Sequence, residues 1–308
     1  MISYELTIKH FDYSILSKEH LSTTFYAALI ATCISFYFIK DQFARISIFL
    51  ISLGLGVYIQ RVDWIALPYI LALASFIYYG LNANHRLLRG WMFLLAIIAS
   101  IYLCLYPKFG LYPIPGIHNW QVAKNFVFSH QALPFSMTFR LDKFLIGLFF
   151  IWFSHRALTN QGSWRGIGQS TIVAWFLAII VLIPIAYFLQ VAKIDIKPTN
   201  FFFVWALHNL FFVCIAEEAI FRGMIQPFLN LKLQNIEGGK YLAIVVTAGL
   251  FGLFHFKSGW SMVLLSSVAG LFYGWAYMKT KRIEASIFVH FAVNALHFLC
   301  FSYPALKF

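Results

Sequence analysis

FFFVWALHNLFFVCIAEEAIFRGMIQPFL, residues 201–229, is an apolar run that is long enough to cross a bilayer. A hydrocarbon core of roughly 30 Å needs about 20 apolar residues in a helix. The run nevertheless carries Glu217, Glu218 and Arg222 near its centre. An ionised side chain at mid-bilayer costs about 2.5–3.5 kcal/mol on insertion scales, so three of them on neighbouring turns need a structural or functional reason.

The rest of the chain is equally apolar. Of its 308 residues, 61% are hydrophobic and 11% are charged, and the mean hydropathy is +0.77. Soluble domains carry roughly 25% charged residues, so this chain lies outside that class. Spans are expected at residues 23–39, 46–60, 64–80, 91–106, 171–191, 201–229, 241–256, 262–278 and 283–302, with a weaker tenth candidate at 138–154. We therefore predict an all-α, polytopic transmembrane helix bundle with nine or ten spans.

Two long connections suggest how the bundle is divided. Residues 107–143 are rich in proline and are expected to form an extramembrane loop or a re-entrant cap. Residues 155–170 are polar and glycine-rich, which is typical of a linker. The sequence thus predicts an N-terminal accessory transmembrane bundle with an extramembrane loop at 1–143, and a functional transmembrane bundle at 144–308.

The formal net charge of +12 fits a membrane protein. Lysine and arginine gather in the short connections between the expected spans, where anionic headgroups and positive-inside retention favour them. The KTKR run at 279–282 assigns its side to the cytoplasm. Nucleic acid is not expected as a partner, because the chain has no basic stripe and no soluble basic domain. The four cysteines lie in apolar runs and form no CxxC pair.

Helix geometry assigns different roles to the charged residues of the central run. Glu218 and Arg222 are four residues apart, so they face each other and can form an ion pair. Glu217 is rotated by about 100° from Glu218. It is expected to remain unpaired and free for chemistry. The alternative is that all three residues form one packing network between helices.

Two histidines in other expected helices can reach the same layer of the membrane. His255 lies four residues after Phe251, and His290 lies four residues before Asn294, so each pair shares a helix face. Counted from one side of the membrane at 1.5 Å per residue, Glu217, His255 and His290 lie at depths of roughly 20, 22 and 12–17 Å. With helix tilt the three can meet, which is hard to explain by packing alone.

The stretches EEAIFR (217–222), FGLFH (251–255) and HFAVN (290–294) follow one another in this order. They resemble the EExxxR, FxxxH and HxxxN/D motifs of the CAAX protease and bacteriocin-processing family, also called CPBP or Abi. The resemblance covers about residues 170–302. It implies an intramembrane endopeptidase of the glutamate type, whereas the first 140 or so residues resemble nothing that can be assigned.

Site residues follow from the resemblance, position by position. It implies a catalytic set of Glu217, His255, His290 and Asn294, and a supporting set of Glu218, Arg222 and Phe251. We hypothesise that Glu217 deprotonates a water held jointly with His255. His290 and Asn294 would then donate hydrogen bonds to the developing oxyanion. No metal ligand and no cofactor are expected.

Three alternatives to this interpretation stay open at the level of sequence. Two glutamates and two histidines can bind a divalent metal such as zinc, which would make the protein a metal-dependent membrane protease, although HExxH is absent. A non-catalytic membrane scaffold or immunity factor that retains the motifs is the second alternative. A transporter is the third, and the lack of an inverted repeat argues against it.

The expected partners are a membrane-associated or lipid-modified protein or peptide substrate and the lipid bilayer. The breadth of the family favours a bacterial plasma (inner) membrane. Cleavage by wild type and its loss on substitution of Glu217 would separate the protease from the scaffold, and resistance to a chelator would exclude the metalloenzyme.

Overall fold

The computed structural model describes residues 14, 16, 19–154, 164–197 and 199–307. Its first half, in chain order, contains α2 (His20–Phe38), α3 (Gln42–Tyr58), η1 (Trp64–Ala66), α4 (Leu67–Asn82), α5 (Arg86–Phe109), β1 (Trp120–Phe126), β2 (Phe135–Phe139) and α6 (Leu141–Phe153). Its second half contains α8 (Trp164–Phe188), α9 (Phe202–His208), η2 (Asn209–Cys214), α10 (Ile215–Glu218), η3 (Ala219–Ile225), α11 (Gln226–Lys232), α12 (Gly239–Leu253), η4 (Phe256–Ser258), α13 (Trp260–Thr280) and α14 (Ile283–Cys300).

The structure confirms the predicted helical membrane bundle. Within the described ranges, seven helices are long and apolar enough to cross a membrane, and two shorter apolar helices, α3 and α12, lie where the other two expected spans were placed. The weaker tenth candidate corresponds to α6, a helix of 13 residues that is buried along nearly its whole length. It is too short to span a bilayer by itself. Its apolar side chains face protein.

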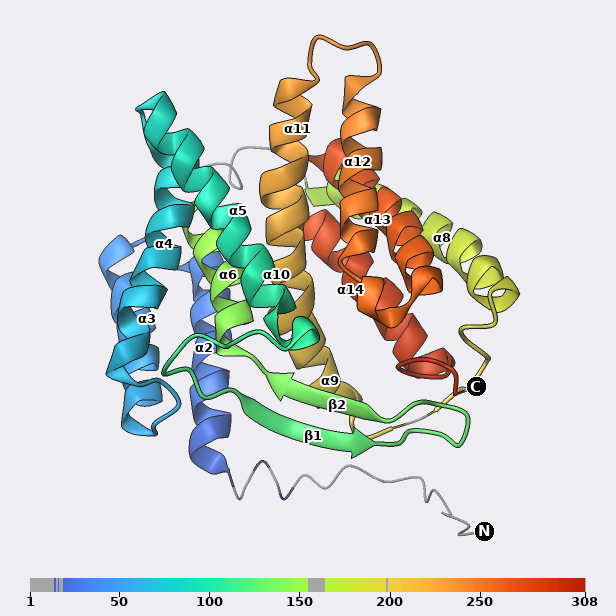
Figure 1. The fold of residues 1–308 in the computed structure, drawn as a ribbon, viewed down its shortest axis with the longest axis horizontal. Helices are drawn as coiled ribbons and strands as arrows, with labels where there is room; N and C mark the ends of the chain where they lie inside the picture. The colour runs from blue at the N-terminus through green and yellow to red at the C-terminus, as the bar shows by residue number, and fades with distance from the viewer. Residues whose placement is uncertain (1–13, 15, 17–18, 155–163, 198, 308) are drawn as a thin grey trace.

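Helix α6 lies between the two halves of the chain. Helices α2 to α5 are on one side and α8 and α12 to α14 are on the other, while α6 and the helix that contains α10 run between them (Figure 1). α6 packs against η2, α10 and η3, and also against α2, α4 and α5. At Gly147 a Cβ atom would come within 2.6 Å of Ile215, so only glycine permits this approach of α6 to α10.

The central run forms one continuous helix from Phe202 to Lys232. Two π-helical segments, η2 and η3, flank the single α-helical turn of α10, which carries both glutamates. Such wider turns are rare and often occur at functional sites. The helix is therefore irregular on both sides of Glu217 and Glu218.

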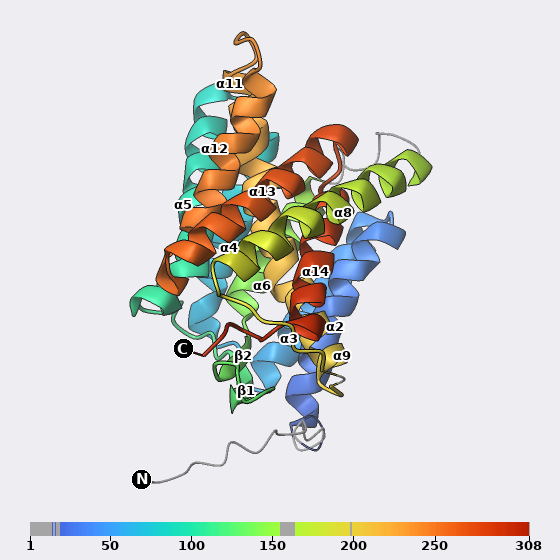
Figure 2. The same ribbon diagram turned by 90° about the vertical axis from the view of Figure 1, so that its right-hand side faces the viewer.

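The C-terminal helices pack closely around this central helix. α13 contacts α8, α12 and α14, and α14 also contacts α8 (Figure 2). Gly270 and Gly274 on α13 lie against other backbones and side chains: a Cβ on Gly270 would come within 3.1 Å of Ala248 on α12. The carbonyls of these two glycines accept hydrogen bonds from Arg222 and Gln226. Small residues thus allow close contact and expose backbone acceptors to polar side chains.

The connection expected at residues 107–143 is more regular than predicted. α5 continues to Phe109, and β1 and β2 form an antiparallel hairpin across one end of the bundle (Figure 1). The hairpin leads directly into α6. The expected linker at 155–170 falls partly outside the described residues, and α8 already begins at Trp164.

The C-terminal tail passes close to the hairpin. Isolated β-bridges join Leu306 to Ala132 and Phe301 to Ile194. The tail therefore connects the loop after α8 with the loop of the hairpin. This arrangement fixes the end of α14 on the same side of the bundle as the hairpin.

Candidate active site

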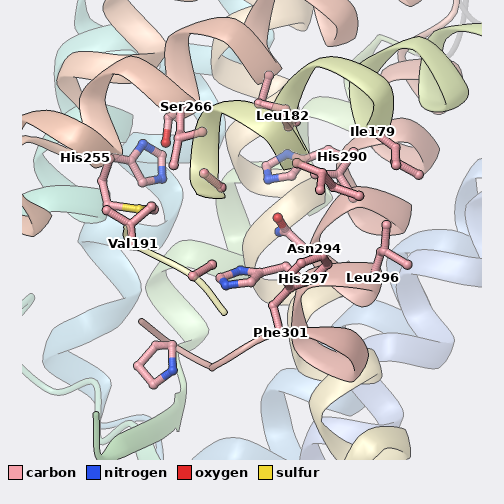
Figure 3. A pocket seen from close by; sticks show the side chains of 18 of the residues that line it. Ile179, Leu182, Val191, His255, Ser266, His290, Asn294, Leu296, His297 and Phe301 are labelled. Carbon is pink, nitrogen blue, oxygen red and sulfur yellow. The ribbon is translucent and has the colours of Figure 1, made fainter. Parts of the chain in front are cut away.

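One cavity of about 200 Å³ lies beside the central helix, between α8, α13 and α14. Its polar lining consists of Glu217, His255, Ser266, Tyr273, His290, Asn294 and His297. The rest of the wall is apolar and comes mainly from α8, α13, α14 and the C-terminal tail. Figure 3 shows His290, Asn294 and His297 along α14, with His255 on the opposite side of the cavity. α14 thus supplies three of the polar groups at one wall, and His255 faces them across an otherwise apolar chamber, which is the usual character of a ligand pocket.

Glu218 lies behind this wall and is fully buried. Its Oε1 accepts hydrogen bonds from Arg222 Nη1 at 3.0 Å and from His290 Nδ1 at 2.9 Å. Arg222 also donates from Nη2 to the Gly270 carbonyl at 2.8 Å. The expected pair of Glu218 and Arg222 is therefore present. It also orients His290, because a paired carboxylate accepts the Nδ1 proton and leaves Nε2 turned toward Glu217.

Aromatic rings hold the same group of side chains. Tyr273 stacks on His290, with ring centroids 4.7 Å apart, and Phe251 meets the His290 ring edge-on at 5.5 Å. The guanidinium of Arg222 lies over the ring of Phe251, 4.9 Å from its centroid. Phe251 thus lines the cavity, as expected, and also contacts the buried cation behind it.

Glu217 has a partner that sequence reasoning missed. Its Oε1 accepts a hydrogen bond of 2.7 Å from Nζ of Lys143, the third residue of α6. The expectation that Glu217 stays unpaired is therefore wrong. Its other oxygen, Oε2, has no hydrogen-bond partner among the described residues and lies 4.0 Å from His290 Nε2.

His255 lies just beyond the helix in which it was expected. α12 ends at Leu253, and His255 belongs to the turn before η4. Its Nδ1 is 3.0 Å from the Phe251 carbonyl. Because a carbonyl can only accept, this nitrogen carries the proton, and Nε2 remains available on a ring that lines the cavity.

Asn294 reaches the cavity from the next turn of α14. Its Nδ2 lies 3.3 Å from the side-chain oxygen of Asn209, which also accepts from the Cys214 thiol at 3.2 Å. The same Nδ2 also donates to Cys214 Sγ at 3.8 Å, so both contacts of this amide are with the central helix. His297 lines the cavity one turn further along α14.

The side chains that line the cavity can hold a small polar molecule. They include a buried carboxylate, two imidazole nitrogens and an amide, which can hold and polarise a small molecule such as water. Among the residues that the structure describes, no group of three or more histidine, cysteine, aspartate or glutamate side chains is placed to hold a metal ion.

The sequence had a weak signal for the missed lysines. Lys143 follows Arg140 and Asp142 at the start of an otherwise apolar run, and an ionisable group at membrane depth favours a functional or paired role. Lys108 near the end of α5 was also missed, and its Nζ donates to the Phe254 carbonyl at 3.2 Å, next to His255.

Residues 199–296 match the model of the family described as type II CAAX prenyl endopeptidase Rce1-like. The match contains all three motifs and confirms the resemblance that was based on them. At the level of the family, it supports a CAAX-type endopeptidase in a membrane that acts on a protein or peptide. The comparisons with curated proteins and with solved structures gave no significant match.

Proposed function

We propose that the protein is an intramembrane endopeptidase in which Glu217 activates a water for attack on a peptide bond. The observation that carries the proposal is the convergence of Glu217, His255, His290 and Asn294 on one cavity. All four lie in the segment that matches the endopeptidase family. Each comes from a different turn or helix, so local sequence effects do not explain why they meet.

The spacing of the carboxylate and His290 supports a bridging water in the proposed mechanism. Oε2 of Glu217 and Nε2 of His290 are 4.0 Å apart, which is too long for a direct hydrogen bond. A bridging water satisfies both atoms. Nε2 of His255 provides a third polar group in the same cavity.

The proposed reaction proceeds in two steps. Glu217 takes a proton from the water as its oxygen attacks the carbonyl carbon, and the carbonyl π electrons move onto its oxygen. When the tetrahedral intermediate collapses, the C–N bond breaks and Glu217 returns the proton to the leaving nitrogen. One fragment with a new carboxyl terminus and one with a new amino terminus result, and Glu217 is again a carboxylate.

Asn294 and His290 are proposed to stabilise the oxyanion. Asn294 lines the cavity and can donate an amide hydrogen to the oxyanion in place of its 3.8 Å contact with Cys214 Sγ, and the doubly protonated form of His290 can donate from Nε2. Glu218 then compensates the imidazolium through its 2.9 Å contact with Nδ1. Donors fixed before the reaction reduce the free-energy barrier more than donors that must reorient.

The apolar wall of the cavity suggests the class of substrate. Side chains such as Leu182 and Ile183 of α8 and Leu265 of α13 surround the polar wall. A membrane-associated or lipid-modified protein or peptide can place apolar groups against them. We propose a bacterial inner membrane as the location, from the breadth of the family alone.

The first test compares wild type with Glu217→Gln in detergent on a library of quenched peptides. The amide has the same shape but cannot accept the water proton, so cleavage is expected to fall by about 10²–10⁴-fold. Glu237→Gln, in the exposed turn between α11 and α12, is the matched control. Full activity of Glu217→Gln at equal protein level would remove Glu217 from the mechanism.

The same assay distinguishes the alternatives. We expect cleavage to survive a strong chelator; loss on chelation and recovery with zinc would instead support a metal-dependent protease. If neither form cleaves any peptide, prenylated peptides in bilayer nanodiscs are the next substrates. Binding of such peptides without cleavage would support a non-catalytic scaffold.

A further inference from the structure

The contact between Lys143 and Glu217 joins the N-terminal half of the chain to the candidate active site. We propose that Lys143 is a positioning residue that holds Glu217 as an ionised carboxylate, with Oε2 directed at the cavity. For its effect on cleavage this inference rests on the proposed function. The ionisation of Glu217, however, can be measured without any substrate.

Charge compensation is the first argument. The side chains of Lys143 and Glu217 are only 13% and 7% exposed. A carboxylate removed from water to this extent is strongly destabilised unless a cation or several donors compensate it. Without compensation it binds a proton, and a protonated carboxyl cannot take another from water. The Nζ–Oε1 contact of 2.7 Å supplies the cation at hydrogen-bond distance.

Direction is the second argument. Lys143 occupies Oε1, while Oε2 lies on the side of His290 Nε2. Glu217 lines the cavity, but Lys143 does not. The lysine therefore acts through the glutamate from behind, and it leaves one carboxylate oxygen for the water. A second donor on Oε2 would have blocked that position.

The rigidity of α6 is the third argument. At its start, Arg140 forms a salt bridge with Asp142 and donates to the Leu103 carbonyl, and the Lys143 amide donates to Asp142 Oδ1 at 2.7 Å. The buried helix then packs on α10, with Gly147 against Ile215. A lysine has several flexible bonds, but here its backbone is fixed on an element that directly contacts the turn of Glu217.

Several other titratable groups interact with Glu217 and must be considered in any test that varies pH. They are Cys104 and Lys108 on α5, Cys214, Glu218 and Arg222 on its own helix, His255 after α12, Tyr273 on α13 and His290 on α14. A change that depends on Lys143 must therefore be shown to involve Glu217 itself.

Infrared difference spectroscopy provides that assignment. The purified protein is compared at neutral pH as wild type, Lys143→Met, Glu217→Gln and the Lys143→Met/Glu217→Gln double variant. Only Lys143→Met is expected to show the C=O stretch of a new protonated carboxyl, and the double variant is expected to lose it. The proposal is overturned if Lys143→Met shows no such band and Glu217→Gln has a weaker carboxylate band than wild type. These two results together would mean that Glu217 stays ionised without its lysine.

Cleavage at several pH values tests the consequence. For Lys143→Met, we expect a loss of at least about tenfold at neutral pH, with partial recovery as the pH rises, because a carboxylate that lacks its cation ionises only at higher pH. Lys143→Arg, which keeps the cation, is expected to retain most activity. Lys124→Met, on the exposed face of β1, makes the same replacement away from the site.

The outcomes separate the two proposals. A uniform loss at all pH values, with no rescue by arginine, would indicate a merely structural role for Lys143. Higher activity in Lys143→Met would show that the pair restrains Glu217, and it would also overturn the proposal. If wild type cleaves neither the peptide library nor prenylated peptides in nanodiscs but the new carboxyl band appears, the assignment of the ion pair stands and the protease proposal fails.

Discussion

The C-terminal helices and the N-terminal half contribute to the site in different ways. In the C-terminal half, the glutamates, histidines and asparagine lie in three motifs, and most of their contacts join helices of that half. The N-terminal half has no motif, yet Lys143 contacts Glu217 and Lys108 contacts the backbone beside His255. The comparison shows that a residue without a recognisable pattern can complete a site when its helix packs against the motif.

The two buried ion pairs show the same difference. Glu218 and Arg222 are neighbours on one helix, so they are close to each other as soon as that helix forms. Lys143 and Glu217 are 74 residues apart in the chain. They meet only after α6 has packed against α10. The first pair depends on local structure and the second on the assembly of the two halves.

Arg222→Met is expected to produce the largest loss of stability, because it removes the cation that compensates Glu218. Both side chains are fully buried. Removal of one partner from a buried pair typically lowers the free energy of unfolding by about 3–5 kcal/mol. Reversible unfolding by sodium dodecyl sulfate in mixed micelles measures the difference from wild type.

Arg86→Met is the control for this measurement, since Arg86 is exposed at the start of α5. It is expected to change the free energy of unfolding by less than about 0.5 kcal/mol. If Arg222→Met were as mild as Arg86→Met, the network around Glu218 would not hold the C-terminal helices together.

Gly147→Ala tests the packing between the two halves. The new methyl would meet Ile215 at 2.6 Å and the Ala216 backbone at 3.3 Å, so α6 must move away from α10. We expect a loss of about 1–3 kcal/mol in the free energy of unfolding. Cleavage is expected to fall as well, because the movement lengthens the contact between Lys143 and Glu217.

Gly90→Ala is the matched control within α5, where no atom lies within 4 Å of the added Cβ. Alanine favours a helix over glycine by roughly 0.5–1 kcal/mol, so this variant is expected to be unchanged or slightly more stable. Equal stability of the two alanine variants would mean that the halves pack loosely and that the N-terminal helices are only an accessory to the site.

Much of the fold was predictable, because apolar runs of about 20 residues have few alternatives to a membrane helix. The exceptions have physical reasons. α6 was too short and too charged at its start to be assigned with the other spans, since only tertiary contacts bury it. The hairpin of β1 and β2 was missed because the prolines of residues 107–143 indicated an ordered extramembrane loop or a re-entrant cap rather than strands.

The site was predictable where contacts are local. Spacing of four residues correctly paired Glu218 with Arg222 and placed Phe251 beside His255, whose rings are 5.1 Å apart. The partner of Glu217 was not predictable, because the helical spacing of one segment contains no information about which distant helix packs against it. The catalytic roles of these residues remain predictions until cleavage is measured.

Lys108→Met is expected to have a smaller effect than Arg222→Met or Gly147→Ala. Nζ of Lys108 donates to the Phe254 carbonyl, which immediately precedes His255, so it holds the turn rather than a reacting group. A single hydrogen bond contributes about 0.5–1.5 kcal/mol, which corresponds to a loss of cleavage of roughly twofold to twelvefold. Lys257→Met is the matched variant, because Lys257 lies on the same turn and its Nζ is 4.8 Å from the centroid of the Phe109 ring at the end of α5. A loss in Lys108→Met alone would assign the effect to the hydrogen bond at Phe254. Equal losses in both variants would instead mean that His255 is positioned by all the contacts between α5 and this turn, and not by one hydrogen bond. The contribution of the N-terminal half would then extend beyond Lys143 and Lys108.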